Sequence, residues 1–186
     1  MTKDNNRILG MIDAMTADEM RTRLSEYMAN DTSLMPRLVA IEVRLAKAGG
    51  ARCRYSVFLI DEQGNEFLVK FRDRYSRLIY IYTLLNPHGY QRRTVAANDY
   101  RALRQLYNLL YLANSDALLK TINSTGYDHF FSHYVTQSRR AVSQASPLAG
   151  SFAIDRPQAH NGNMLIPFVE QGGTVIIDNS LLNKQV

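Results

Sequence analysis

The spacing of apolar residues changes along this chain, and the order of the changes limits the folds that it can adopt. Over residues 38–71 apolar and polar side chains alternate, which is the pattern of strands with one buried face. Between residues 75 and 145 apolar residues recur every three or four positions, as in amphipathic helices, and short apolar runs return over residues 152–178. Strands, helices and strands in this order predict an α+β fold.

The first strands are expected to form an antiparallel meander. Alternation runs over residues 39–45 and again over residues 53–59, and the glycine-containing segment 47–52 separates the two runs as a turn would. A second turn at residues 61–65 leads into a third short run. The sequence therefore predicts three antiparallel strands within residues 38–71.

Four helices are expected to follow. The first must end at Asn86-Pro87-His88-Gly89, because proline has no amide donor and glycine allows a left-handed cap. The pair Asn114 and Ser115 interrupts the helical pattern further along. The predicted helices cover residues 75–85, 97–111, 116–123 and 128–145.

A second antiparallel meander is expected at residues 152–155, 164–169 and 174–178. Its second turn, EQGG, is short, whereas its first loop, RPQAHNGN at residues 156–163, is long and polar. This loop holds an arginine, a histidine and amide side chains, which can all donate hydrogen bonds. The alternative interpretation is an ordinary hairpin loop in which asparagine and glycine supply the turn geometry.

The first part of the chain is expected to be a separate helical appendage. Apolar residues recur at helical spacing over residues 8–15, and Thr16 with Glu19 matches a capping box ahead of a second apolar stripe. The predicted division is a helical appendage at residues 1–33 and an α+β domain at residues 34–186. We expect the appendage to mediate homodimer formation or the docking of a protein partner.

Positive charge is concentrated in one region. The net charge is +5, and residues 51–110 hold ten Lys and Arg against five acidic residues, with tyrosines between the cations. Lys and Arg near phosphate groups release condensed counterions, so this composition favours the binding of nucleic acid. The alternative is a solvated helix face whose cations pair with acids elsewhere in the fold.

The order of elements resembles the winged-helix effector domains of response regulators, in which a small antiparallel sheet precedes a helix-turn-helix that carries a β wing. The resemblance covers residues 38–178 and implies a winged helix-turn-helix that binds double-stranded DNA. It implies that the helix at residues 128–145 reads the major groove, that residues 156–163 form the wing, and that the segment before the second helix touches phosphates. The DNA-binding residues implied are His133, Thr136, Gln137, Arg139, Arg140, Arg92, Arg93, Arg156, His160, Asn161 and Asn163.

Catalytic and metal-binding patterns are weak in this sequence. His129 and His133 are four residues apart, but the segment HFFSH lacks the Glu of the H-E-x-x-H zinc motif. The single cysteine, Cys53, falls inside a strand pattern, where cysteine is usually a small buried hydrophobe. No glycine-rich phosphate loop precedes a helix. We therefore expect no catalytic residue, no metal and no cofactor.

The sequence as a whole predicts a cytoplasmic protein. A single cysteine offers no internal disulfide, the N-terminus lacks the pattern of a signal peptide, and no apolar run reaches the roughly 18 residues that a membrane span needs. The favoured function is sequence-specific binding of double-stranded DNA, as in a transcriptional regulator. A non-enzymatic protein-interaction module on the same scaffold is the alternative, and an enzyme of unknown reaction is the third hypothesis.

Overall fold

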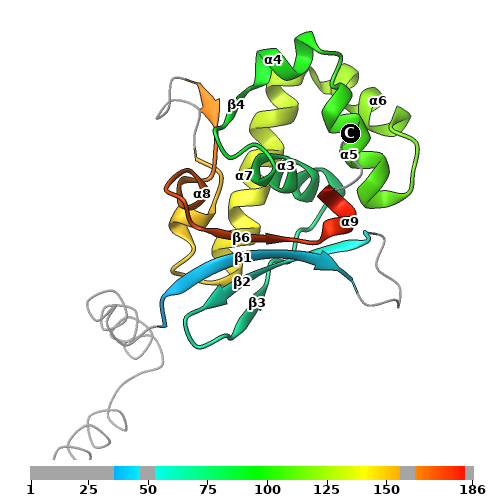
Figure 1. Ribbon diagram of the computed structural model, residues 1–186. Helices are drawn as coiled ribbons and strands as arrows, with labels where there is room; N and C mark the ends of the chain where they lie inside the picture. The colour runs from blue at the N-terminus through cyan, green and yellow to red at the C-terminus, as the bar shows by residue number, and fades with distance from the viewer. Residues whose placement is uncertain (1–35, 47–52, 156–161, 183–186) are drawn as a thin grey trace, which may run out of the picture. The chain divides into compact units, whose positions relative to one another are not determined.

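The fold is mixed α+β, with helices gathered on one side of a four-stranded sheet (Figure 1). Contacts divide the chain into two units, residues 1–36 and 37–186, and this fold belongs to the second. The predicted α+β class is confirmed. The appendage predicted at residues 1–33 lies outside the described residues. The computed structural model of the chain describes residues 36–46, 53–155 and 162–182.

The sheet begins with the antiparallel meander that the alternating pattern predicts. The first strand, β1 (Leu38–Leu45), pairs antiparallel with β2 (Tyr55–Asp61), which pairs antiparallel with β3 (Glu66–Leu68). Ile41 lies opposite Leu59 in the β1–β2 register, and both side chains are fully buried. The meander is therefore confirmed, and one of its faces belongs to the hydrophobic core.

The fourth strand of the sheet comes from the C-terminal part of the chain. β6 (Thr174–Ile177) lies parallel to β1 at the sheet edge. A short helix, α9 (Asn179–Leu182), follows it, and Leu181 in this helix is fully buried. Ser180 Oγ lies 2.9 Å from the hydroxyl of Tyr55 in a hydrogen bond, which fixes α9 to β2.

Four of the observed helices correspond to the four predicted ones. They are α3 (Arg74–Leu84), α5 (Arg101–Tyr111), α6 (Asp116–Thr125) and α7 (Tyr127–Ala145). The predicted start of the second helix near residue 97 is wrong, because Asp99 and Tyr100 have φ angles of 49° and 52° and break the helical path. Before this break lies a separate short helix, α4 (Arg92–Ala97), which the sequence pattern does not predict.

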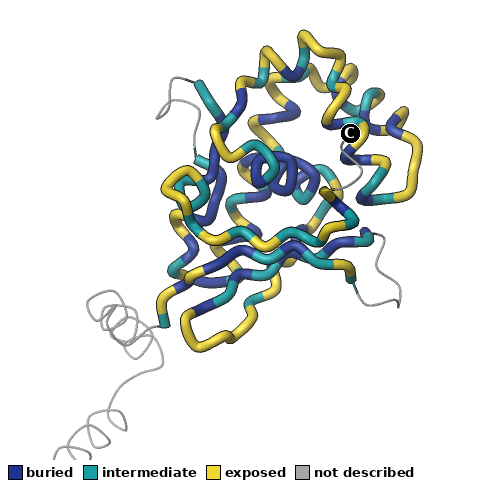
Figure 2. Tube along the Cα trace, viewed as in Figure 1, coloured by how far each residue is buried: buried dark blue, intermediate teal, exposed yellow. Residues whose placement is uncertain are grey.

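The helix α3 forms the centre of the fold. Asp73 caps its first turn, because its carboxylate accepts a hydrogen bond of 2.7 Å from Ser76 N. Every residue from Leu78 to Leu84 is buried, and Figure 2 shows α3 as a dark blue coil enclosed by the elements around it. Both α7 and α5 pack against α3, so their opposite sides are left facing outward.

The second meander predicted for the C-terminal part is wrong. Its first run includes a 3₁₀ turn, η2 (Gly150–Phe152), and its second run divides into β5 (Asn163–Met164) and the short helix α8 (Pro167–Glu170). The proline explains the helix, since it offers no N–H to a strand and is favoured in a first helical turn. β5 pairs with β4 (Tyr90–Gln91), and the third run is β6, which pairs with β1.

One backbone contact between the first and second runs of the predicted meander is observed, on either side of residues 156–161. Asp155 N donates a hydrogen bond of 2.8 Å to Leu165 O, so the segments before and after these residues lie side by side. Gly89, just before β4, lies against the second of these segments. Its φ angle is 75°, and a Cβ at this position would lie 3.1 Å from Met164 O. The lack of a side chain at Gly89 therefore lets the chain before β4 approach β5 closely.

Candidate nucleic-acid interface

The two sides of α7 differ in burial. Phe131, Val135 and Val142 are buried on the side toward α3. The opposite side, which we call the outer side of α7, is exposed within the described structure. A helix of 19 residues is about 28 Å long, so this side spans several turns. The exposed residues on it are His129, Ser132, His133, Thr136, Arg140, Ser143 and Gln144.

Three of the five residues predicted to read DNA from α7 lie on its outer side: His133, Thr136 and Arg140. The imidazole rings of His129 and His133 stack with their centroids 6.1 Å apart and their planes 18° apart. Thr136 Oγ1 donates a hydrogen bond of 2.9 Å to Ser132 O, so its oxygen can still accept one from outside. Gln137, the fourth predicted residue, is half-buried beside Arg140.

Arg139 turns away from the outer side. Its Nη1 donates a hydrogen bond of 2.6 Å to the carbonyl oxygen of Ile154 and lies 4.0 Å from Asp155 Oδ1. Ile154 is fully buried, so this bond satisfies a carbonyl that water does not reach. The structure thus gives Arg139 a positioning role between α7 and the segment before residues 156–161, and the base contact predicted for it stays a prediction.

Arg92 ties the start of α4 to the start of α7. Its Nη1 lies 3.2 Å from Asp128 Oδ1 and donates a hydrogen bond of 3.2 Å to Ser132 Oγ. Arg93, its neighbour, is exposed and makes no side-chain hydrogen bond or ion pair with the described residues. Of the two arginines predicted to touch phosphates, only Arg93 therefore has a guanidinium that nothing in the described structure engages.

A hollow of about 520 Å³ joins these arginines to the predicted wing. It is lined by Arg92 and Arg93 from α4, by Asp128 from α7, and by Gly162, which follows residues 156–161 in the chain. The wing residues Arg156, His160 and Asn161 lie outside the described residues. Asn163, the fourth, is half-buried in β5, where it pairs with Gln91. Segments far apart in the sequence are thus adjacent at the N-terminal end of α7.

Tyr90 of β4 holds the junction of β4 and β5 against α3. The hydroxyl of Tyr90 lies 3.3 Å from Thr83 Oγ1 in a hydrogen bond, and its ring meets that of Tyr82 edge-on at 4.8 Å. Burial raises the pKa of Tyr90 well above its ordinary value, so the phenol stays neutral at physiological pH. β4 is therefore held to α3 by neutral contacts that do not change with moderate pH.

A second hollow, of about 250 Å³, lies beside the C-terminal half of α7. Lys70 and Arg72, from the connection between β3 and α3, line it together with Arg140 and Gln137. None of the three cations makes a side-chain hydrogen bond or ion pair with the residues that the structure describes, so their charges are not neutralised locally. The sequence placed Lys70 and Arg72 in the basic region, but only the fold brings them to α7.

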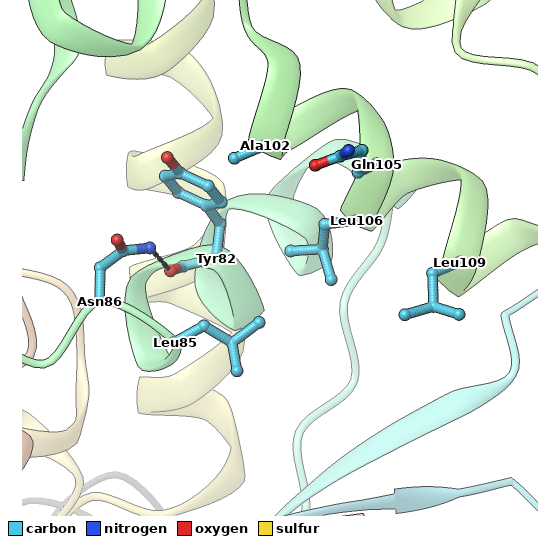
Figure 3. A pocket seen from close by; sticks show the side chains of 7 residues that line it. All are labelled: Tyr82, Leu85, Asn86, Ala102, Gln105, Leu106 and Leu109. Carbon is cyan, nitrogen blue, oxygen red and sulfur yellow. Dashed lines mark hydrogen bonds between the residues drawn. The ribbon is translucent and has the colours of Figure 1, made fainter. Parts of the chain in front are cut away.

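The groove between α3 and α5 has a different character. Figure 3 shows Leu85 and Leu106 lining it near Tyr82, and its volume is about 130 Å³. Asn86 Nδ2 donates a hydrogen bond of 2.7 Å to Tyr82 O, which satisfies a carbonyl at the end of α3. No Lys or Arg lines this groove, so it offers nothing that attracts phosphate.

The described part of the chain contains neither an assembled metal site nor an exposed thiol. No three His, Cys, Asp or Glu side chains come together there as a metal site would require. Cys53 is buried, and its thiol donates a hydrogen bond of 3.4 Å to Tyr55 O. Within the same residues, no helix combines the length and the apolar content needed to cross a membrane.

Comparison of the chain with protein-family models, with curated proteins and with solved structures finds no match. The candidate interface is therefore defined by the geometry of the outer side of α7 and by the two cationic hollows at its ends.

Proposed function

We propose that the protein binds double-stranded DNA through the outer side of α7, as a winged-helix regulator does. The observation that carries this proposal is the hollow in which Arg92, Arg93, Asp128 and Gly162 meet. It brings the start of α4, the start of α7 and the end of the predicted wing loop to one place. These are the parts that a helix-turn-helix with a wing must present together to one DNA duplex.

The order of elements also supports this proposal. α3, α4 and α7 would supply the helices of a helix-turn-helix, with α5 and α6 added between the second and third. The segments joined by the bond from Asp155 N to Leu165 O would supply the base of the wing. The Arg139 bond to Ile154 would then fix the wing relative to the reading helix.

The chemistry of the exposed side chains suggests how the contacts divide. Arg140 could donate two hydrogen bonds to a guanine edge, and Thr136 and His133 could each bond a base edge or a phosphate. Arg93, Lys70 and Arg72 would contact phosphates at the two ends of α7. The predicted wing residues Arg156, His160, Asn161 and Asn163 would complete the surface.

A protein-interaction module stays the second candidate, because the outward face of the sheet exposes apolar side chains on both edge strands, on either side of the ion pairs of Arg44. Leu68 lies opposite Phe58 in the β2–β3 register, and Ile176 lies opposite Glu42 in the β1–β6 register. Leu68 and Ile176 are 42% and 48% exposed. Exposed apolar side chains beside charged ones are a feature of surfaces that bind other proteins.

The salt dependence of binding tests the proposal. The full chain would be titrated against labelled random-sequence duplexes, and the bound fraction would be followed by fluorescence anisotropy. If about six phosphates are contacted, the affinity should fall on the order of a thousandfold between about 50 and about 200 mM salt. Absence of binding at the lower salt, or an affinity that salt leaves unchanged, would favour the protein-interaction module.

A further inference from the structure

A third hollow, of about 550 Å³, is lined by residues from the start of α3, the end of α5 and α7. Its α7 residue is the half-buried Tyr134 and not one of the exposed residues of the outer side, although it shares Arg72 with the second hollow. Sites for small molecules commonly have volumes of about 300–1,000 Å³, so this hollow is large enough to hold one. Of its lining residues, only Arg72 also belongs to the proposed DNA contacts.

The charge of this hollow is positive. Arg72, Arg74 and Arg77 line it, and the one acid among its lining residues, Asp73, is engaged as the cap of α3. Arg72 has no side-chain partner in the described structure. Arg74 uses Nη1 to donate a hydrogen bond of 2.8 Å to the hydroxyl of Tyr107. Because a guanidinium carries five N–H donors, both arginines retain donors for an anion.

Flat aromatic rings form the walls of the same hollow. Phe71, Tyr75, Tyr111 and Tyr134 line it, and the rings of Tyr75 and Tyr134 meet with their centroids 5.1 Å apart. The guanidinium of Arg77 lies 5.6 Å from the ring centre of Phe71. Burial raises the pKa of Tyr111 and of Tyr134, so their phenols stay neutral at physiological pH. The walls therefore add surfaces for stacking without adding negative charge.

We propose that this hollow binds a small molecule in which a phosphate group is joined to a flat ring, as in a nucleoside monophosphate. The arginines bind the phosphate through charge-assisted hydrogen bonds. The tyrosines and Phe71 stack on the ring. The ring of Tyr134 also meets the ring of His133 edge-on, with their centroids 4.8 Å apart. Because His133 belongs to the outer side of α7, a ligand stacked on Tyr134 would lie next to that side. The site shares Arg72 with the proposed DNA contacts, but nucleotide binding is measured without DNA, so the two proposals can fail separately.

Calorimetric titration of the full chain with a panel of probes tests this proposal. The probes are AMP, GMP, CMP and UMP, phenyl phosphate, the neutral nucleoside adenosine, and inorganic phosphate. At least one nucleotide should bind with a Kd on the order of 100 μM or lower, and at least tenfold more tightly than inorganic phosphate or adenosine. Equal binding of all phosphates would indicate an adventitious ion only and would overturn the proposal, as would no binding.

Variants locate the site. Arg72→Gln removes an exposed cation with no described partner, so the fold should persist, and nucleotide affinity should fall about tenfold. Because Arg72 also lines the second hollow, Lys70→Gln is its control: it removes an exposed cation of the second hollow alone and should leave nucleotide affinity unchanged. Arg101→Gln removes an exposed cation from the other end of α5 and should leave it unchanged. Tyr134→Leu should weaken the nucleotide more than inorganic phosphate. Chemical-shift changes at Tyr111 and Ala113 should accompany binding. Unchanged affinity in Arg72→Gln would refute the site even if nucleotide binds elsewhere.

Discussion

Arg139 on α7 donates a hydrogen bond of 2.6 Å to the buried carbonyl oxygen of Ile154, and this bond holds the segment that leads into residues 156–161 against the helix. Arg140, the next residue, points outward and has no side-chain partner in the described structure. Two adjacent arginines on one helix thus have different roles: the half-buried Arg139 is bonded within the protein, and Arg140 lies exposed at its surface. This difference makes them a matched pair for mutation.

Arg139→Ala should destabilise the fold, because it leaves the carbonyl of Ile154 buried without a donor. The expected loss in the free energy of unfolding is about 1–3 kcal/mol, measured by urea denaturation of the full chain. Arg140→Ala is the control and should change that free energy by no more than about 0.5 kcal/mol. Equal losses in the two variants would show that the Arg139 bond contributes little.

Arg93→Ala and Arg140→Ala should change DNA binding in different ways. Removing Arg93 should weaken binding to all duplexes alike and reduce the slope of log affinity against log salt by about one, because one phosphate contact is lost. Removing Arg140 should cost about 1–3 kcal/mol at the preferred sequence and less on random duplex. Anisotropy titrations over a range of salt concentrations measure both effects.

Lys120→Ala is the control for this pair, since Lys120 is an exposed cation on α6 that lines neither of the two hollows beside α7. It changes the net charge by the same amount and should leave both the affinity and its salt slope nearly unchanged. If all three variants behave alike, only net charge matters, and the outer side of α7 is not a reading surface.

Gly89→Ala should destabilise the junction between β4 and β5. The left-handed φ of 75° alone costs an L-residue roughly 1–2 kcal/mol, and the new Cβ would also press on Met164 O at 3.1 Å. Gly64→Ala is the matched control, because Gly64 has a φ of 82° with nothing within 4 Å of an added Cβ. Thermal denaturation should show the larger loss for Gly89→Ala, and losses of equal size would mean that the close approach is tolerated.

The parts of the fold that the sequence predicts are those in which one side of an element is buried. Alternation over residues 53–59 predicts β2, because Tyr55, Val57 and Leu59 face the core. In β1, Ile41 and Val43 also face the core, but a register shift between Leu38 and Ala40, which the alternation does not predict, leaves Val39 exposed. The run TVII at residues 174–177 also predicts a strand, but its pattern does not reveal the partner. β6 pairs with β1, more than 130 positions earlier in the chain, and only tertiary packing selects that neighbour.

The candidate site shows the same limit. The sequence indicates Arg92, Arg93 and the loop at residues 156–163 separately, and only the fold brings them together. The inward direction of Arg139, however, has a signal in the sequence. It lies four residues after Val135 and three before Val142, both apolar, so helical spacing places it toward the buried side of α7. Arg140 lacks these neighbours and lies outside.

Asp61 should make stability depend on pH below about 4. Burial opposes its charged form, but its carboxylate accepts hydrogen bonds from Asn65 Nδ2 at 2.9 Å, Asn65 N at 2.8 Å and Gln63 N at 2.9 Å. These bonds outweigh the burial and lower the pKa of Asp61 below its ordinary value of 3.8.

Because the folded pKa lies below the unfolded one, the stabilisation by Asp61 is complete above pH 3.8 and is lost as the pH falls through the folded pKa. In Asp61→Asn the turn at residues 61–65 should be weakened at pH 7, and the difference from the parent chain should shrink as the pH approaches 2. Urea midpoints measured at several pH values give this comparison. A difference that stays constant from pH 7 to pH 2 would mean that the side chain acts through its shape and not through its charge.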